Sequence, residues 1–496
     1  MRRFSVSEYA VLGAYLLLVA GLGASFYRRK ATARDYFLGG RSMSWLPVGI
    51  SIVAADLSAI TLMGVPGWAF RYDLQLTWTY YGTLLAAGPM IWIFVPFYSG
   101  LQLYTAYEYL ERRFNVAVRL LASALFQFLR LVHVAVALYG PSLALNLVTG
   151  LPVAQCVLLI GAITTVYTSF GGVKAVIWTD VIQFVTICSG IGLMFWAALH
   201  QIDGGIPAVT TLARDAGRLK IWDPTLNPTE ELAFWPCLLG GAILSLSGLS
   251  TDQALLQRLF TTKSRRDATQ SIIANAVLTV PLLFLLCGLG IVLFAFYQQH
   301  PEELKSLPNP DAILPYFAVQ HLPGAIAALV VAAIFAASMA VMSAGINSLS
   351  TAATADFYQR LFQPAAAPEQ YVRFGRAATV AWGVLATLMA LFMGRLGALV
   401  LAYAKVNSLV AGPMLGIFLL GMLTRRATSG GTLAGAAAGA AAVAAVASLT
   451  SVSFYYHALI GTAVTVSAGW LASWLTAPPV PAQIKGLVLA AAQEGK

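Results

Sequence analysis

Apolar stretches of about 20 residues recur along the whole chain, and they restrict the possible folds more than any other feature. A helix of that length crosses the roughly 30 Å of hydrocarbon in a bilayer. Of the 496 residues, 59% are apolar and 10% are charged, whereas about 25% are charged in soluble domains. We therefore expect an all-α polytopic membrane protein rather than two or three soluble domains. The thirteen expected spans are 6–26, 43–68, 76–99, 118–148, 151–169, 176–199, 233–252, 270–297, 322–355, 372–394, 398–422, 430–449 and 453–476.

The first apolar stretch is predicted to be a retained helix. It is long enough to span, and Arg28, Arg29 and Lys30 follow it where a signal peptide would have a cleavage site. The four cysteines lie in apolar segments without a CxxC spacing, so neither disulfides nor a metal cluster are expected.

Basic residues in the loops predict the orientation of the chain. Of the 30 Lys and Arg residues, 20 fall in one set of alternate loops, 8 fall on the other side, and Arg130 and Lys405 lie inside spans. The richer side should be cytoplasmic, which places the N-terminus outside and the C-terminus inside, although Arg2 and Arg3 oppose this. The net charge of +10 then needs no nucleic acid to explain it.

Two spans are interrupted by small and polar residues. The second contains Gly49-Ile-Ser-Ile-Val-Ala-Ala-Asp-Leu-Ser58, and the seventh contains Ser245-Leu-Ser-Gly-Leu-Ser-Thr-Asp252. Paired discontinuous helices, five spans apart, are typical of inverted-repeat transporters with a site at the midplane. Close packing of helices through small residues is the alternative explanation.

The expected organisation is a single transmembrane domain over 1–476, followed by a short cytoplasmic tail at 477–496. Its parts are a leading helix and loop at 6–42, a first repeat at 43–199, a second repeat at 233–422 and two additional helices at 430–476.

Five motifs follow one another along the chain: Asp35-Tyr-Phe-Leu-Gly-Gly-Arg41, Tyr107-Glu-Tyr-Leu-Glu-Arg-Arg-Phe114, Gly171-Gly-Val-Lys-Ala-Val-Ile-Trp-Thr-Asp-Val-Ile-Gln183, Thr251-Asp-Gln253 with Gln257-Arg258, and Asn347-Ser348 with Asp356-Phe-Tyr358. Together they resemble the motifs of the sodium:solute symporter family. The chain resembles the bacterial sialic acid:sodium symporters, within the group that includes the sodium/glucose cotransporters. This resemblance implies a 5+5 inverted-repeat fold with broken helices.

The resemblance implies a sodium site built from three backbone carbonyls and two side-chain hydroxyls. The carbonyl positions fall on Ala54, Leu57 and Ala337, but the hydroxyl positions fall on Ala340 and Val341. A hard cation needs oxygen ligands, which alkyl side chains cannot supply. The sodium site is therefore expected to be weak or absent.

Some family members bind a second sodium ion, and part of that ligand set is present here. Asp180 and Ser343 match, whereas Ala344 replaces a further serine. Because Asp180 follows Lys174 near the end of its span, a structural salt bridge or a contact at the helix end is the alternative role.

Asp56 is the most informative residue of the expected substrate site, because a carboxylate inside a membrane span marks an ion path or a ligand site by default. Its partner could be a proton, an amino group of the substrate or a protein cation such as Lys405; a structural role in the unwound backbone is the alternative. Where the sialic acid symporters hold the substrate carboxylate with an arginine, this chain has His133, with Arg130 one turn earlier. Either could meet an anion, but sialic acid itself is disfavoured.

Three further residues, Ser58, Thr61 and Tyr80, match positions that contact substrate in the family. A serine or threonine in a membrane helix also bonds its own backbone, which is their alternative role.

These observations favour a secondary transporter that moves a small polar organic solute, with Na⁺ as the coupling ion implied by the family. A proton-coupled or uncoupled carrier using Asp56, Asp180 or His133 is the first alternative, and a sensor on a transporter scaffold is the second. An enzyme is disfavoured because no nucleophile–base pair or metal cluster is recognisable. The expected location is the inner membrane, with a monomer as the functional unit.

The orientation can be tested by thiol labelling in a variant that lacks the four native cysteines. A cysteine placed at Lys263 should react with a membrane-impermeant reagent only from the cytoplasmic side, and one at Arg218 only from outside. Reversed labelling would contradict the orientation that the loop charges predict.

Overall fold

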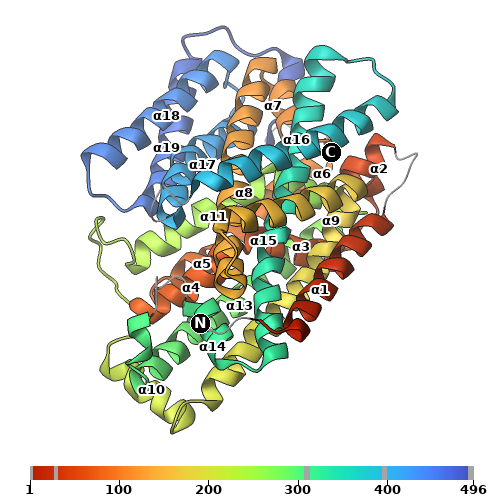
Figure 1. Cartoon of the computed structure of the whole chain (residues 1–496). Coiled ribbons are helices and arrows are strands. Elements are labelled where there is room, and N and C mark those ends of the chain that lie inside the picture. Colours follow the sequence, from red (N-terminus) through yellow and green to blue (C-terminus); the bar gives the residue numbers. More distant parts are fainter. Residues whose placement is uncertain (1–3, 27–31, 307–312, 394–398, 490–496) are drawn as a thin grey trace.

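The protein is almost entirely helical. The structure is a computed structural model that describes residues 4–26, 32–306, 313–393 and 399–489 (Figure 1), and no strand is formed among them. The expected all-α class is confirmed. The α-helices are α1 (Val6–Ser25), α2 (Ala33–Leu38), α3 (Trp45–Asp56), α4 (Ala59–Arg71), α5 (Thr77–Pro89), α6 (Val95–Ser99), α7 (Tyr107–Arg113), α8 (Val116–Thr149), α9 (Val153–His200), α10 (Gly205–Asp215), α11 (Gly241–Thr251), α12 (Gln253–Phe260), α13 (Arg265–Gln299), α14 (Ile313–His321), α15 (Gly324–Ala352), α16 (Pro368–Met393), α17 (Leu399–Leu423), α18 (Ser429–Leu449) and α19 (Phe454–Ser473). Three π-helical segments, η2 (Met90–Phe94), η3 (Pro236–Gly240) and η6 (Ala353–Phe362), adjoin α5, α11 and α15.

Nine helices in the described part are long and apolar enough to cross a membrane, and the bent pair α3–α4 makes ten candidates. α9 alone has 48 residues, or about 72 Å at 1.5 Å per residue, which is more than one bilayer requires. The count of thirteen spans and the inverted repeat stay predictions.

A kink at Gly172 divides α9 between the expected spans 151–169 and 176–199. Gly172 has φ 60° and ψ −166°, a conformation open mainly to glycine. A Cβ atom there would lie 2.6 Å from the carbonyl oxygen of Tyr36. Gly172 thus lets helix α2 approach the kink closely.

Both expected helix breaks are present. α3 and α4 meet at a bend of 60°, where Leu57 and Ser58 leave the helical conformation. The second break lies at Asp252, whose extended backbone (φ −81°, ψ 118°) separates α11 from α12. In both cases a polar side chain caps the following helix: Ser58 accepts from the Thr61 N–H, and Asp252 accepts from the Ala254 N–H.

α15 runs through the middle of the molecule (Figure 1). It packs against α8 and α9, and every residue from Val330 to Ala352 is buried. The C-terminal helices α17, α18 and α19 pack against one another at one side. α3 contacts α9, α13 and α15, which places the first break beside the central helix.

α5 and α11 approach so closely that only glycine fits between them. A Cβ atom on Gly82 would lie 2.3 Å from the backbone nitrogen of Ala242, and one on Gly241 would lie 2.2 Å from the carbonyl oxygen of Thr79. Such contacts between small residues are a common way for membrane helices to associate.

We predict that Gly82→Ala destabilises the protein by about 1–3 kcal/mol, because the added methyl group forces the two backbones apart. Gly192→Ala is the matched control, since nothing lies within 4 Å of a Cβ atom at that position. Thermal unfolding in detergent compares the two variants. Equal melting temperatures would contradict the close approach.

Candidate functional site

A cavity of about 200 Å³ lies where the two helix breaks meet α8, α13 and α17. Its lining combines charged side chains with neutral amides and hydroxyls. The polar lining residues are Asp56, Thr83, Arg130, His133, Ser245, Ser247, Thr251, Asp252, Asn275, Thr279 and Asn407. Polar side chains inside a membrane protein characteristically face such cavities.

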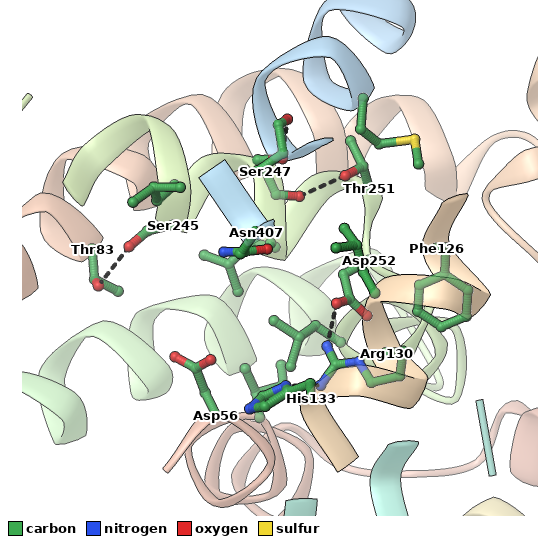
Figure 2. Close-up of a pocket in the computed structure, with 18 of the residues that line it drawn as sticks. Asp56, Thr83, Phe126, Arg130, His133, Ser245, Ser247, Thr251, Asp252 and Asn407 are labelled. Atoms are coloured by element: carbon green, nitrogen blue, oxygen red, sulfur yellow. Dashed lines mark hydrogen bonds and ion pairs between the residues drawn. The ribbon is translucent and has the colours of Figure 1, made fainter. Parts of the chain in front are cut away.

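Asp56 is the last residue of α3, so the helix break carries its carboxylate into the cavity. The residue is exposed, whereas Ala55 and Leu57 on either side are buried. Figure 2 shows Asp56 apart from the other charged residues of the cavity. Among the described residues, no hydrogen bond or ion pair engages its carboxylate. This negative charge is therefore available to a partner that enters the cavity.

Arg130 on α8 is held by two partners. Its guanidinium forms an ion pair with Asp252 at the second break (Figure 2), and its Nη1 lies 3.0 Å from Nδ1 of His133. Arginine only donates hydrogen bonds, so His133 Nδ1 accepts and the proton of the neutral imidazole sits on Nε2. Both α8 side chains are buried, and Asp252 is 24% exposed.

The structure brings Asp56, Arg130 and His133 together in this cavity but leaves Ser58, Thr61 and Tyr80 outside its lining. Ser58 caps α4, with its Oγ 3.2 Å from the Thr61 N–H and 3.3 Å from Thr61 Oγ1. Tyr80 is half-buried on α5. The side chain of Lys405 lies outside the described residues.

Sequence reasoning did not name Asp252, Asn275 or Asn407 as site residues. Asp252 is the last residue of segment 245–252, which the sequence predicts to be a helix break. That predicted break is the sequence signal that could have identified Asp252 as a site residue. Asn275 and Asn407 are single amides within apolar spans. A lone amide of this kind carries too little information to be assigned to a cavity without the fold.

The first break releases two of the backbone carbonyls expected to bind sodium. In a continuous helix, the N–H groups of Ser58 and Thr61 would bond the carbonyls of Ala54 and Leu57. Here the Ser58 N–H donates to the Asp56 carbonyl (3.1 Å), and the Thr61 N–H donates to Ser58 Oγ. α15, which carries Ala337, Ala340 and Val341, contacts α3, and all three of these residues are fully buried.

Asp180 on α9 is fully buried in an ion pair with Arg258 of α12 at 2.8 Å. The same carboxylate oxygen, Oδ2, accepts a hydrogen bond from Ser51 Oγ of α3 at 2.5 Å. The other oxygen, Oδ1, has no hydrogen-bond partner in the described part of the chain, and neither does Oε1 of nearby Gln183. The Ser343 hydroxyl donates to the Ala340 carbonyl of its own helix at 3.1 Å.

α12 is anchored by the polar side chains of three of its residues, which follow the second break in the sequence. Gln253 Nε2 donates to the Tyr104 carbonyl at 2.9 Å, and its Oε1 accepts from the Ala106 N–H at 3.0 Å. Gln257 Nε2 donates to the Phe37 carbonyl (2.8 Å). With Arg258, these side chains connect α12 to α2, to the loop before α7 and to α9. All three of them are almost completely buried.

Comparisons with known proteins agree on a similarity to sodium-coupled transporters. The model of the sodium:solute symporter family matches residues 36–439. The sodium/sialic acid symporter NanT of Aliivibrio fischeri is 34% identical over 480 residues, which cover 94% of this chain and 93% of that protein. The human sodium/iodide cotransporter is 32% identical, over 87% of this chain and 68% of its own length.

The solved structures agree. A Na⁺-coupled sialic acid symporter in a substrate-bound outward-open state superimposes with a TM-score of 0.89 and 31% identity, over 96% of this chain and 99% of that one. Mhp1, a nucleobase-cation-symport-1 family transporter, reaches a TM-score of 0.57 at 15% identity, over 91% and 97%, and so shares the fold.

The Asp180–Arg258 pair yields a stability prediction. Arg258→Met should destabilise the protein by about 3–5 kcal/mol, because it leaves a fully buried carboxylate without its cation. Adding Asp180→Asn should recover part of that loss. Unfolding in detergent measures both.

The control for this pair is Lys220→Met, which breaks an exposed ion pair with Asp223. Its loss should stay within about 1 kcal/mol. If Arg258→Met costs no more than the control, the buried pair is not a structural support.

Proposed function

The chain belongs to the sodium:solute symporter family, and we propose that it carries a small polar organic solute across the membrane by alternating access, coupled to sodium through a weakened ion site. The observation that supports this proposal is the polar cavity at the meeting point of the two helix breaks. The chain is a multi-pass membrane transporter, as its family and its apolar helices establish.

The solute is proposed to bind between α3, α8, α11, α13 and α17, where Asp56, Arg130 and His133 line the cavity. An interrupted helix lines the cavity at each of the two breaks. Rocking one set of helices against the other around such a site is how broken-helix transporters expose it alternately. Ser58, Thr61 and Tyr80 then act on the solute indirectly, through the shape of α4 and α5.

The sodium ion is proposed to lie between α3 and α15. The freed carbonyls of Ala54 and Leu57, together with that of Ala337, would supply three oxygens, while Ala340 and Val341 supply none. Water can complete the shell at a cost in affinity, so sodium should bind weakly.

A second cation site remains a proposal for Asp180 and Ser343. The acceptor oxygen Asp180 Oδ1 is buried without a donor in the described structure, which supports it. Arg258 already neutralises the carboxylate, which weakens the need for a second ion.

The proposal is tested in proteoliposomes with a solute identified by a thermal-shift screen in sodium and in potassium buffer. The native protein should show weak, poorly saturable sodium stimulation. Ala340→Ser/Val341→Ser should lower the half-maximal sodium concentration about tenfold or more, which corresponds to about 1.4 kcal/mol, because two oxygen ligands are restored.

Ala332→Ser, on the same helix, is the matched control and should leave sodium dependence unchanged. Tight one-site sodium binding by the native protein would contradict the weakened site. Accumulation driven by an imposed proton gradient without sodium would favour the proton-coupled alternative. Binding without any flux would favour the sensor.

A further inference from the structure

The charges around the cavity do not cancel. Among the described residues, its lining contains two carboxylates, Asp56 and Asp252, and one guanidinium, Arg130, and the other described side chains except His133 carry no ionisable group. His133 is neutral when its Nδ1 accepts from Arg130. The lining therefore holds one negative charge more than it can neutralise by itself.

Arg130 is not free to bind an anion. Its guanidinium is paired with Asp252 and also reaches His133. A solute carboxylate could replace Asp252 only by leaving that aspartate without its cation. The cavity thus differs from one in which an arginine is kept open for an acidic solute.

Asp56 is the source of the excess charge. Its carboxylate is exposed to the cavity and has no hydrogen-bonded partner among the described residues. A carboxylate within the membrane is costly unless a counter-charge accompanies it. No residue of α15 lines this cavity, so the carboxylate faces the solute chamber rather than the side of α3 where sodium is proposed to bind.

We propose that the transported solute carries a positively charged nitrogen, as an organic cation or a zwitterion, and that this nitrogen pairs with Asp56. The inference rests on the proposed transport function and names its class of substrate. The amides of Asn275 and Asn407 and the hydroxyls of Thr83 and Ser245 offer uncharged contacts to the rest of the solute. The cavity is small beside the roughly 300–1,000 Å³ of ordinary ligand sites, so the solute is small as well.

The test uses pairs of compounds that differ mainly in this charge. Butylammonium is compared with butanol, 4-aminobutanoate with 4-hydroxybutanoate, and piperidine-2-carboxylate with tetrahydropyran-2-carboxylate. Thermal shift and competition of uptake in proteoliposomes report binding and transport to the full-length protein. The native protein should prefer the nitrogen-bearing member of at least one pair by tenfold or more.

Two variants change the charge of the cavity without changing its shape much. Asp56→Asn should abolish the preference, because it removes the unpaired charge. Asp56→Asn/Asp252→Asn leaves Arg130 as the sole charge and should favour the carboxylate compounds over butylammonium. Asp56→Glu keeps the negative charge and should keep the preference for the nitrogen-bearing compounds. This variant still tests the inference if Asp56→Asn does not fold.

Several results would overturn the inference. Equal affinity for both members of every pair would contradict pairing of the solute with Asp56. If neutral or anionic compounds were nevertheless taken up, the proposed transport function would still hold. Loss of sodium-induced stabilisation in Asp56→Asn with an unchanged amine preference would assign Asp56 to the ion instead. Lys405→Gln should leave the preference unaltered, and a stronger amine preference in this variant would make Lys405 the resident partner of Asp56. Amine binding without flux would refute transport but not the charge recognition.

Discussion

The site depends on what happens to backbone polar groups when a helix is interrupted inside a membrane. Hydrocarbon offers them no hydrogen bonds, so irregular backbone persists there only where it is buried in protein or lines a cavity. At the first break, the Ser58 hydroxyl accepts a hydrogen bond from the Thr61 N–H. At the second break, the Asp252 carboxylate accepts one from the Ala254 N–H. The carbonyls left behind, at Ala54 and Leu57, become potential ligands. The caps, the cavity and the proposed ion site are thus consequences of these two interruptions.

Two arginine–aspartate pairs act in different ways because their surroundings differ. Asp180 is completely enclosed, and its pairing with Arg258 fastens α12 to α9 and α3. Asp252 is partly exposed, and its pairing with Arg130 occupies a cation inside the chamber. The first pair supports the architecture, whereas the second determines which charges remain available to a solute. Asp56 stands out because no such partner engages it among the residues that the structure describes.

Part of the fold and of the candidate site could be predicted from local sequence patterns. The all-α class, the breaks near 49–58 and 245–252, and the division of α9 near Gly172 follow from apolar length and from small or polar interruptions, which are properties of neighbouring residues. The ion pairs were not predictable, because Arg130 and Asp252 are 122 residues apart and Asp180 and Arg258 are 78 apart. When its pairing with Asp252 is not known, Arg130 is interpreted from the sequence as a cation that could bind an anionic solute. Asp180 was expected either to bind an ion or to make a structural salt bridge or helix-end contact, and in the structure it pairs with Arg258.

The anchoring of α12 has a consequence for the speed of the transport cycle. Gln253, Gln257 and Arg258 are buried and bonded to three separate parts of the molecule. If α12 swings aside when the chamber opens toward the opposite face, these bonds must break almost together, since each is held in place by the others. Concerted loss of several buried bonds gives a large enthalpy of activation, so turnover would rise steeply with temperature.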